Sequence, residues 1–179
     1  MNNSAPLLVL IGPPGSGKSR IGKRVAKMLG SEFIDTDRRI VAAHGRIAEI
    51  FEMHGERYFR FIERGIVAEV LKERAVVSLG GGAVLDNETQ RELADKRVVL
   101  LSVSAVAVAK RLGGTKRPLL AGTSASDRIE AWQRIVDSRR RMYEKLAQRT
   151  WDTSRRPIDQ LAREIADWVE HDTAGIESL

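Results

Sequence analysis

The stretch LLVLIGPPGSGKSR, residues 7–20, passes from a short apolar run into glycine and proline and ends with lysine, serine and arginine. Its central part, Gly12–Ser19, matches the pattern G-x-x-x-x-G-K-[S/T] after a predicted strand and before a predicted helix. A chance glycine turn is the alternative, and both flanks disfavour it. Glycines let successive backbone N–H groups curl around phosphate oxygens that larger side chains would obstruct. The stretch therefore predicts a P-loop that binds a nucleoside triphosphate.

The residues of this loop have separate expected tasks. The backbone of Gly15, Ser16 and Gly17 would contact the phosphates, assisted by the dipole of the helix that begins at the loop. Lys18 would reach the β- and γ-phosphates, and the hydroxyl of Ser19 would ligate Mg²⁺. A P-loop indicates only nucleotide binding, so the reaction must be inferred from a second site.

Composition limits the class of protein. The 179 residues, 42% hydrophobic and 30% charged, fit one domain. There is no cysteine, no apolar run near the roughly 20 residues of a membrane span and no basic leader, so we expect a cytoplasmic protein. The net charge of +6 requires an anionic partner to be considered, but basic and acidic residues are interleaved. For the densest basic run, Arg139–Arg141, a solvated helix face is favoured over a nucleic-acid-binding stripe.

Short apolar runs alternate with amphipathic segments along the chain. The runs are residues 7–11, 33–35, 75–79 and 97–103, and the helical stripes contain Ile21, Val25 and Met28, then Phe59, Ile62, Ile66 and Val70, then Ile158, Leu161, Ile165 and Trp168. Short runs of Val, Leu and Ile are typical of strands buried on both faces of a parallel sheet. The order of the elements predicts a doubly wound α/β fold.

The segment FIDTD, residues 33–37, places two carboxylates at the end of the second predicted strand. On a strand, Asp35 and Asp37 would point the same way, into the crevice beyond the carboxyl ends of the strands that also holds the P-loop. One could hold Mg²⁺ through water, and the other could accept a proton from an attacking hydroxyl. A helix N-cap is an equally strong explanation for Asp37, because a helical pattern follows it.

Two further stretches are less specific. Arg60 and Glu63 in GERYFRFIE, residues 55–63, are one helical turn apart, so a surface ion pair is the simplest interpretation. The segment GGTKRPLLAGTSAS, residues 113–126, combines glycine, proline and small polar residues around Arg117, which predicts a mobile loop.

Taken together, GPPGSGKS, DTD, IAEIFEMHGERYFRFIE, SLGGGAV, RPLLAG and SRRRMY resemble the shikimate kinase family, in this order and over nearly the whole chain. The resemblance implies a single-domain P-loop kinase of residues 1–179 with a five-stranded parallel sheet flanked by helices. Its core would span about residues 6–170, with a substrate-binding helical segment at about 37–74 and a lid at about 112–124. Its cofactors would be ATP and Mg²⁺, and it would be a monomer without nucleic-acid or membrane partners.

The resemblance also implies roles for individual residues. The catalytic residues would be Lys18, Asp37 and Arg117; the metal would be held by Ser19, with Asp35 behind it through water. The nucleotide side would comprise Gly15, Ser16, Gly17, Lys18, Ser19, Arg20, Arg111, Arg117 and Arg156. Shikimate, a ring acid with several hydroxyls, would be bound by Asp37, Arg60, Gly81 and Arg139. Two arginines are a natural clamp for its carboxylate.

The chain departs from the family pattern at two points that concern the site. Arg20 replaces the usual threonine after GKS, and its charge could alter nucleotide affinity. The run of three arginines leaves Arg140 as a second choice for the role of Arg139. Two alternatives remain: another P-loop small-molecule kinase acting on gluconate or a nucleoside monophosphate, and a basic P-loop protein that binds nucleotide or nucleic acid without such catalysis.

Overall fold

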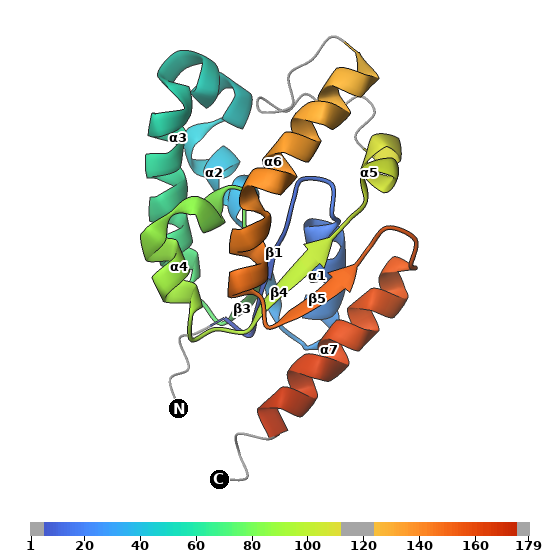
Figure 1. The fold of residues 1–179 in the computed structure, drawn as a ribbon. Helices are drawn as coiled ribbons and strands as arrows, with labels where there is room; N and C mark the ends of the chain where they lie inside the picture. The colour runs from blue at the N-terminus through green and yellow to red at the C-terminus, as the bar shows by residue number, and fades with distance from the viewer. Residues whose placement is uncertain (1–5, 112–123, 175–179) are drawn as a thin grey trace.

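A computed structural model describes residues 6–111 and 124–174 of the chain (Figure 1). Its centre is a five-stranded sheet with the strand order β2-β3-β1-β4-β5, and all neighbouring strands are parallel. The strands are β1 (Leu8–Ile11), β2 (Glu32–Asp35), β3 (Ala75–Ser78), β4 (Val98–Ser102) and β5 (Arg149–Asp152). The predicted α/β fold with a five-stranded parallel sheet is therefore confirmed.

Helices cover both faces of this sheet. They are α1 (Lys18–Met28), α2 (Thr36–His44), α3 (Ile47–Val70), the short 3₁₀ helix η1 (Ala83–Leu85), α4 (Asn87–Leu93), α5 (Ala105–Arg111), α6 (Ala125–Leu146) and α7 (Ile158–Ala174). None of the helices in the described part of the chain could cross a membrane.

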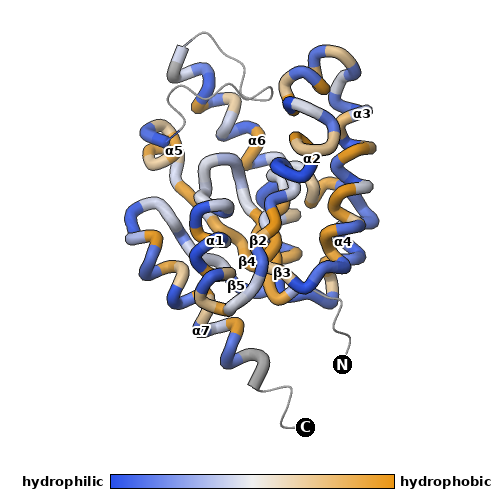
Figure 2. Tube along the Cα trace, turned by 180° about the vertical axis from the view of Figure 1, so that it is seen from behind, coloured by the Kyte–Doolittle hydropathy of each residue, from blue (hydrophilic) through white to orange (hydrophobic). Residues whose placement is uncertain are grey.

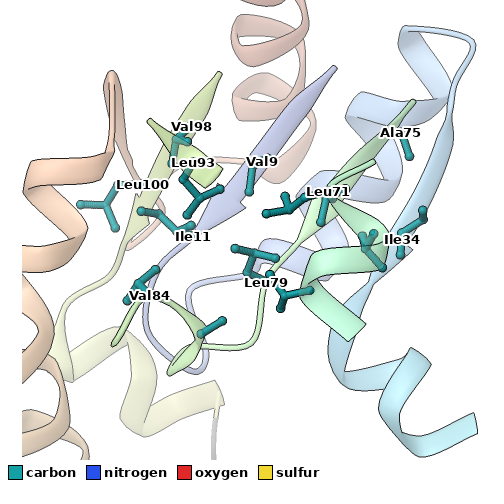
Figure 3. Close-up of a cluster of buried hydrophobic side chains, with 14 of the residues drawn as sticks. Val9, Ile11, Ile34, Leu71, Ala75, Leu79, Val84, Leu93, Val98 and Leu100 are labelled. Carbon is teal, nitrogen blue, oxygen red and sulfur yellow. The ribbon is translucent and has the colours of Figure 1, made fainter. Parts of the chain in front are cut away.

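The core is divided by the sheet because successive strand residues face opposite sides. Leu8 and Leu10 of β1 pack with residues of α1 and α7 in one buried cluster. Val9 and Ile11 pack on the other side with residues of α3, α4 and α6, as the close-up in Figure 3 shows in part. Figure 2 shows hydrophobic residues along the central strands and a mixture of both kinds along the surrounding helices.

Three features differ from the expectations drawn from the sequence. The edge strand β5 has the sequence RTWD and is mostly exposed, so the sequence contains no apolar run that would predict it. In the stripe of α1, Ile21 and Val25 are fully buried but Met28 is 43% exposed, because it is the last residue of the helix, where the chain turns away. The predicted loop of residues 113–126 ends earlier, since Ser124 caps α6 in a reciprocal capping box with Asp127.

Helix α3 consists of two helical pieces joined at Gly55. This residue has φ 80° and ψ 173°, a conformation that side-chain-bearing residues rarely adopt. A small buried cluster of Ile40, Ile50, Phe59 and Ile62 joins α2 to both pieces of α3. Helices α2 and α3 therefore form a lobe beside the sheet, over most of the segment predicted to bind substrate.

Candidate active site

The P-loop curves between β1 and α1 with three glycines in positive-φ conformations: Gly12, Gly15 and Gly17. At Gly12 a Cβ atom would lie 2.3 Å from the carbonyl oxygen of Leu101, so only glycine fits. Helix α1 begins at Lys18, so the free N–H groups of its first turn lie at the loop. The side chain of Lys18 folds back over the loop, where Nζ donates to the carbonyl oxygens of Gly12 at 2.8 Å and Pro13 at 3.1 Å.

A pocket of about 340 Å³ extends from this loop. Most predicted nucleotide-side residues line it: Gly15, Ser16, Gly17, Lys18, Ser19, Arg20 and Arg111. Arg111 is fixed there because its Nη1 donates to the Gly15 carbonyl at 3.0 Å and to Thr153 Oγ1 at 3.2 Å. Arg156 does not line the pocket; it pairs instead with Glu164 of α7. The structure thus gathers all the described nucleotide-side candidates except Arg156.

Ser19 and Asp35, the two predicted metal ligands, are adjacent. The hydroxyl of Ser19 donates to Asp35 Oδ2 at 2.5 Å. Within the described residues no cluster of three or more acidic, histidine or cysteine side chains could hold a metal by itself. Mg²⁺ commonly uses one or two protein oxygens and completes its shell with phosphates and water, so this hydroxyl and carboxylate fit it.

Asp37 is not on the strand, contrary to the expectation that both carboxylates extend from β2. The strand ends at Asp35, whose side chain caps α2 by accepting from the backbone N–H of Arg38 at 3.3 Å. The helix N-cap is therefore Asp35, and Asp37 lies in the first turn of α2. Asp37 nevertheless lines the nucleotide pocket, and it also lines a second pocket on its other side.

The second pocket has a volume of about 600 Å³ and lies between α2, α3, α6 and the loop after β3. All four predicted substrate-binding residues line it: Asp37, Arg60, Gly81 and Arg139. Phe51 and Phe59 of α3 add an apolar wall, with ring centroids 4.8 Å apart. The pocket thus combines three arginines (Arg46, Arg60 and Arg139) and four carboxylates (Asp37, Glu49, Glu52 and Glu63) with aromatic surface.

Arg60 is held by two carboxylates, but not as a surface ion pair. Its Nη1 donates to Glu63 Oε2 at 2.5 Å, and its Nη2 donates to Glu56 Oε1 at 3.0 Å. Glu63 is only 3% exposed. Burial is the largest influence and raises the pKa of Glu63, and the negative charge of Asp37 raises it further; Arg60 and Arg139 lower it without cancelling this rise. The ion pair of Arg60 with Glu63 that the spacing suggested is therefore present, but its acid is buried, which the spacing could not show.

The three consecutive arginines of α6 have different environments. Arg139 is 6% exposed and faces the second pocket, so a solvated helix face was the wrong expectation for it. Arg140 is exposed and pairs with Asp137 at 2.7 Å. Helix geometry explains the difference, because residues one apart point about 100° away from each other. Arg139 is thus the better placed of the two candidates.

The glycine loop, Gly80–Gly82, borders the second pocket. A Cβ atom on Gly80 would lie 2.7 Å from both Asp37 Oδ1 and Glu63 Oε1, and one on Gly82 would lie 2.3 Å from Arg60 Nη1. At Gly81 the nearest atom would be 3.4 Å away. The two outer glycines are therefore the ones that leave room for the charged side chains.

Arg117 and residues 112–123 of the predicted lid lie outside the described residues. Ser124 is the only residue of the predicted lid that is described, and it caps α6.

The chain is similar to known proteins in sequence and in fold. The family model described as shikimate kinase matches residues 14–170. A shikimate kinase of Mycobacterium avium is 48% identical over 164 residues, which are 90% of this chain and 92% of the relative. One of Streptomyces coelicolor is 42% identical over 170 residues, 93% of this chain and 97% of the relative. The solved shikimate kinase of Acinetobacter baumannii in complex with shikimate superposes with a TM-score of 0.87 at 28% identity and 96% coverage of both chains.

Proposed function

The chain belongs to the shikimate kinase family, and from this we infer that it transfers the γ-phosphoryl group of ATP to shikimate, giving ADP and shikimate 3-phosphate. The product is an intermediate on the way to chorismate and the aromatic amino acids. Phosphoryl transfer depends mostly on positioning and on neutralisation of charge, so the absence of a histidine or cysteine nucleophile is no obstacle.

One observation carries this proposal: the nucleotide pocket and the second pocket meet at Asp37. A kinase must place the attacking hydroxyl beside the terminal phosphate, with both reactants in one arrangement. The side chain that borders both pockets is a carboxylate, which can orient the hydroxyl and accept its proton. Asp37 is therefore the proposed base.

On the nucleotide side, we assign the phosphates to the P-loop. The backbone of Gly15–Ser19 and the ammonium of Lys18 would bind the β- and γ-phosphates, and Lys18 would leave the carbonyls of Gly12 and Pro13 to do so. Mg²⁺, ligated by Ser19 with Asp35 behind it, would supply additional positive charge to the phosphates. Arg111, which also lines the pocket, would flank the rest of the nucleotide.

On the acceptor side, Arg60 and Arg139 form the proposed clamp for the carboxylate of shikimate. Both guanidinium groups belong to largely buried side chains, where a carboxylate is bound more strongly than in water. With the carboxylate held there, the ring would lie against Phe59, and its hydroxyls would face Asp37. Gluconate lacks a ring, and a nucleoside monophosphate needs a base-binding pocket, so neither matches this arrangement as well.

Other parts of the proposal rest on the sequence and the family resemblance. These are Arg117 in a lid at about residues 112–124, the role of Arg156, the single domain of residues 1–179 with a substrate-binding segment at about 37–74, the monomeric state and the cytoplasmic location. For Arg156, the ion pair with Glu164 would have to break before it could reach the nucleotide.

The experiment that tests the proposed function is ADP release by the purified protein with ATP and Mg²⁺. Shikimate, gluconate and a nucleoside monophosphate are compared as acceptors, and Lys18→Ala serves as the inactive control. We expect strong stimulation by shikimate alone. If shikimate stimulates no more than the other two acceptors, the assignment of the second pocket is wrong.

A further inference from the structure

Helix α6 contributes three buried side chains that can donate hydrogen bonds. Trp132 is 1% exposed, Arg139 is 6% exposed and Tyr143 is 2% exposed. Their spacing of seven and four residues places them on one face of the helix. Arg139 belongs to the second pocket, the proposed acceptor pocket, but the two aromatic residues have no role in the reaction described so far. A buried indole N–H and a buried phenol O–H each require a hydrogen-bond acceptor.

Each aromatic residue finds its acceptor in a different active-site loop. Trp132 Nε1 donates to the carbonyl oxygen of Pro14 in the P-loop at 2.8 Å. The hydroxyl of Tyr143 donates to the carbonyl oxygen of Gly81 in the glycine loop at 2.5 Å. The two loops also approach each other, since a Cβ atom on Gly81 would lie 3.4 Å from Cδ of Pro14. One helix therefore holds the loops of both pockets.

We propose that Tyr143 is a positioning residue for the acceptor site: its hydroxyl fixes the orientation of the peptide between Gly81 and Gly82. In a trans peptide the carbonyl and the following N–H point in opposite directions. With the Gly81 carbonyl directed at Tyr143, the N–H of Gly82 is directed away from it. No hydrogen bond from this N–H is found among residues 6–111 and 124–174, and Gly82 lines the acceptor pocket beside Arg60.

The electrostatic environment keeps this hydrogen bond in place. Burial raises the pKa of the Tyr143 phenol, although neighbouring Arg139 lowers it in part, so the hydroxyl remains a donor at neutral pH. An N–H donor held next to two arginines would contribute a third hydrogen bond to a bound carboxylate. Without the hydroxyl, the carbonyl of Gly81 loses its partner and the peptide loses its fixed orientation.

The test removes single hydrogen-bonding groups and measures KM separately for the two substrates. For Tyr143→Phe we expect the KM for shikimate to rise roughly fivefold, the size of one hydrogen bond, and the KM for ATP to change by less than twofold. For Trp132→Phe we expect the reverse: the KM for ATP should rise, and the KM for shikimate should change little. Tyr58→Phe, which removes the hydroxyl of the other tyrosine, 45% exposed on α3, is the matched control.

This inference rests on the proposed function, so binding is also measured without turnover. The shifts in melting temperature produced by shikimate and by ADP are recorded for each variant. A shikimate shift that is reduced in Tyr143→Phe, with the ADP shift retained, supports the inference. If Tyr143→Phe only lowers the melting temperature and leaves both KM values and both shifts unchanged, or affects both substrates equally, the inference is wrong. If shikimate does not stabilise the unmodified protein, the proposed function itself fails.

Discussion

A substitution at Gly82 tests how the glycine loop controls the acceptor pocket. An alanine Cβ at this position would lie 2.3 Å from Nη1 of Arg60 and 2.6 Å from its Cζ, so the guanidinium must move. The backbone of Gly82 has φ −101°, which alanine adopts without strain. The substitution therefore acts on the position of Arg60 and leaves the fold of the loop unchanged.

The expected rise in KM for shikimate follows from the hydrogen bond that a displaced Arg60 would lose. A hydrogen bond to a charged group is worth about 1.5–3 kcal/mol, so KM for shikimate should rise roughly 10- to 150-fold. The overpacking itself should cost about 1 kcal/mol, because the clashing atoms end a flexible side chain. That corresponds to a decrease of about 2–4 °C in melting temperature for a protein of this size. KM for ATP should not change.

A double-mutant cycle tests whether Gly82→Ala acts by displacing Arg60. Steady-state ADP release with varied shikimate is measured for Gly82→Ala, Arg60→Ala and the double variant. If Gly82→Ala acts by displacing Arg60, it should add almost nothing once Arg60 is removed. Gly81→Ala, whose Cβ would meet nothing nearer than 3.4 Å, serves as the comparison, and its effect should add to that of Arg60→Ala. Additive effects of Gly82→Ala and Arg60→Ala would refute the explanation.

Four other substitutions, one of them a control, probe the remaining charges of the site. Arg139→Lys should raise KM for shikimate about tenfold or more, because one bidentate contact is lost, whereas Arg140→Lys at the exposed neighbour should leave it within about twofold; a larger effect at Arg140 would exchange the two assignments. Asp37→Asn should lower kcat by about 100-fold or more with a smaller effect on either KM, and an unchanged kcat would exclude it as the base. Because the pKa of Glu63 is raised above its ordinary 4.5, its contribution to stability is greatest below pH 4.5 and is lost as pH rises through the raised value. As the pH rises from 4.5 to 7, the melting temperature of Glu63→Gln should therefore increase relative to that of the unmodified protein. A difference between the two melting temperatures that does not change with pH would contradict this.

Local sequence information was sufficient for some parts of the site. The P-loop was predictable because consecutive backbone groups form it, and three of its glycines have the positive φ angles that favour glycine. The strands β1, β3 and β4 were predictable because both of their faces are buried. Strand β5 was missed because an edge strand with a single aromatic residue carries no apolar pattern.

Other parts depend on contacts that no local pattern contains. The partners of Trp132 and Tyr143 are 118 and 62 residues away in the chain, so their roles appear only in the folded molecule. Arg156 matched a nucleotide-side position, but a carboxylate on α7 holds it elsewhere. The burial of Glu63 likewise arises from the approach of the glycine loop.

The position of Asp37 at the junction of the two pockets also has a consequence for inhibitor design. Because Asp37 borders both pockets, the nucleotide pocket and the second pocket adjoin at this one side chain. A single molecule that joins a nucleoside polyphosphate to a hydroxylated ring acid could therefore occupy both pockets across Asp37. Its second half would bind at the effective concentration set by the linker, so the tether length that gives the highest affinity would measure the separation of the reacting groups.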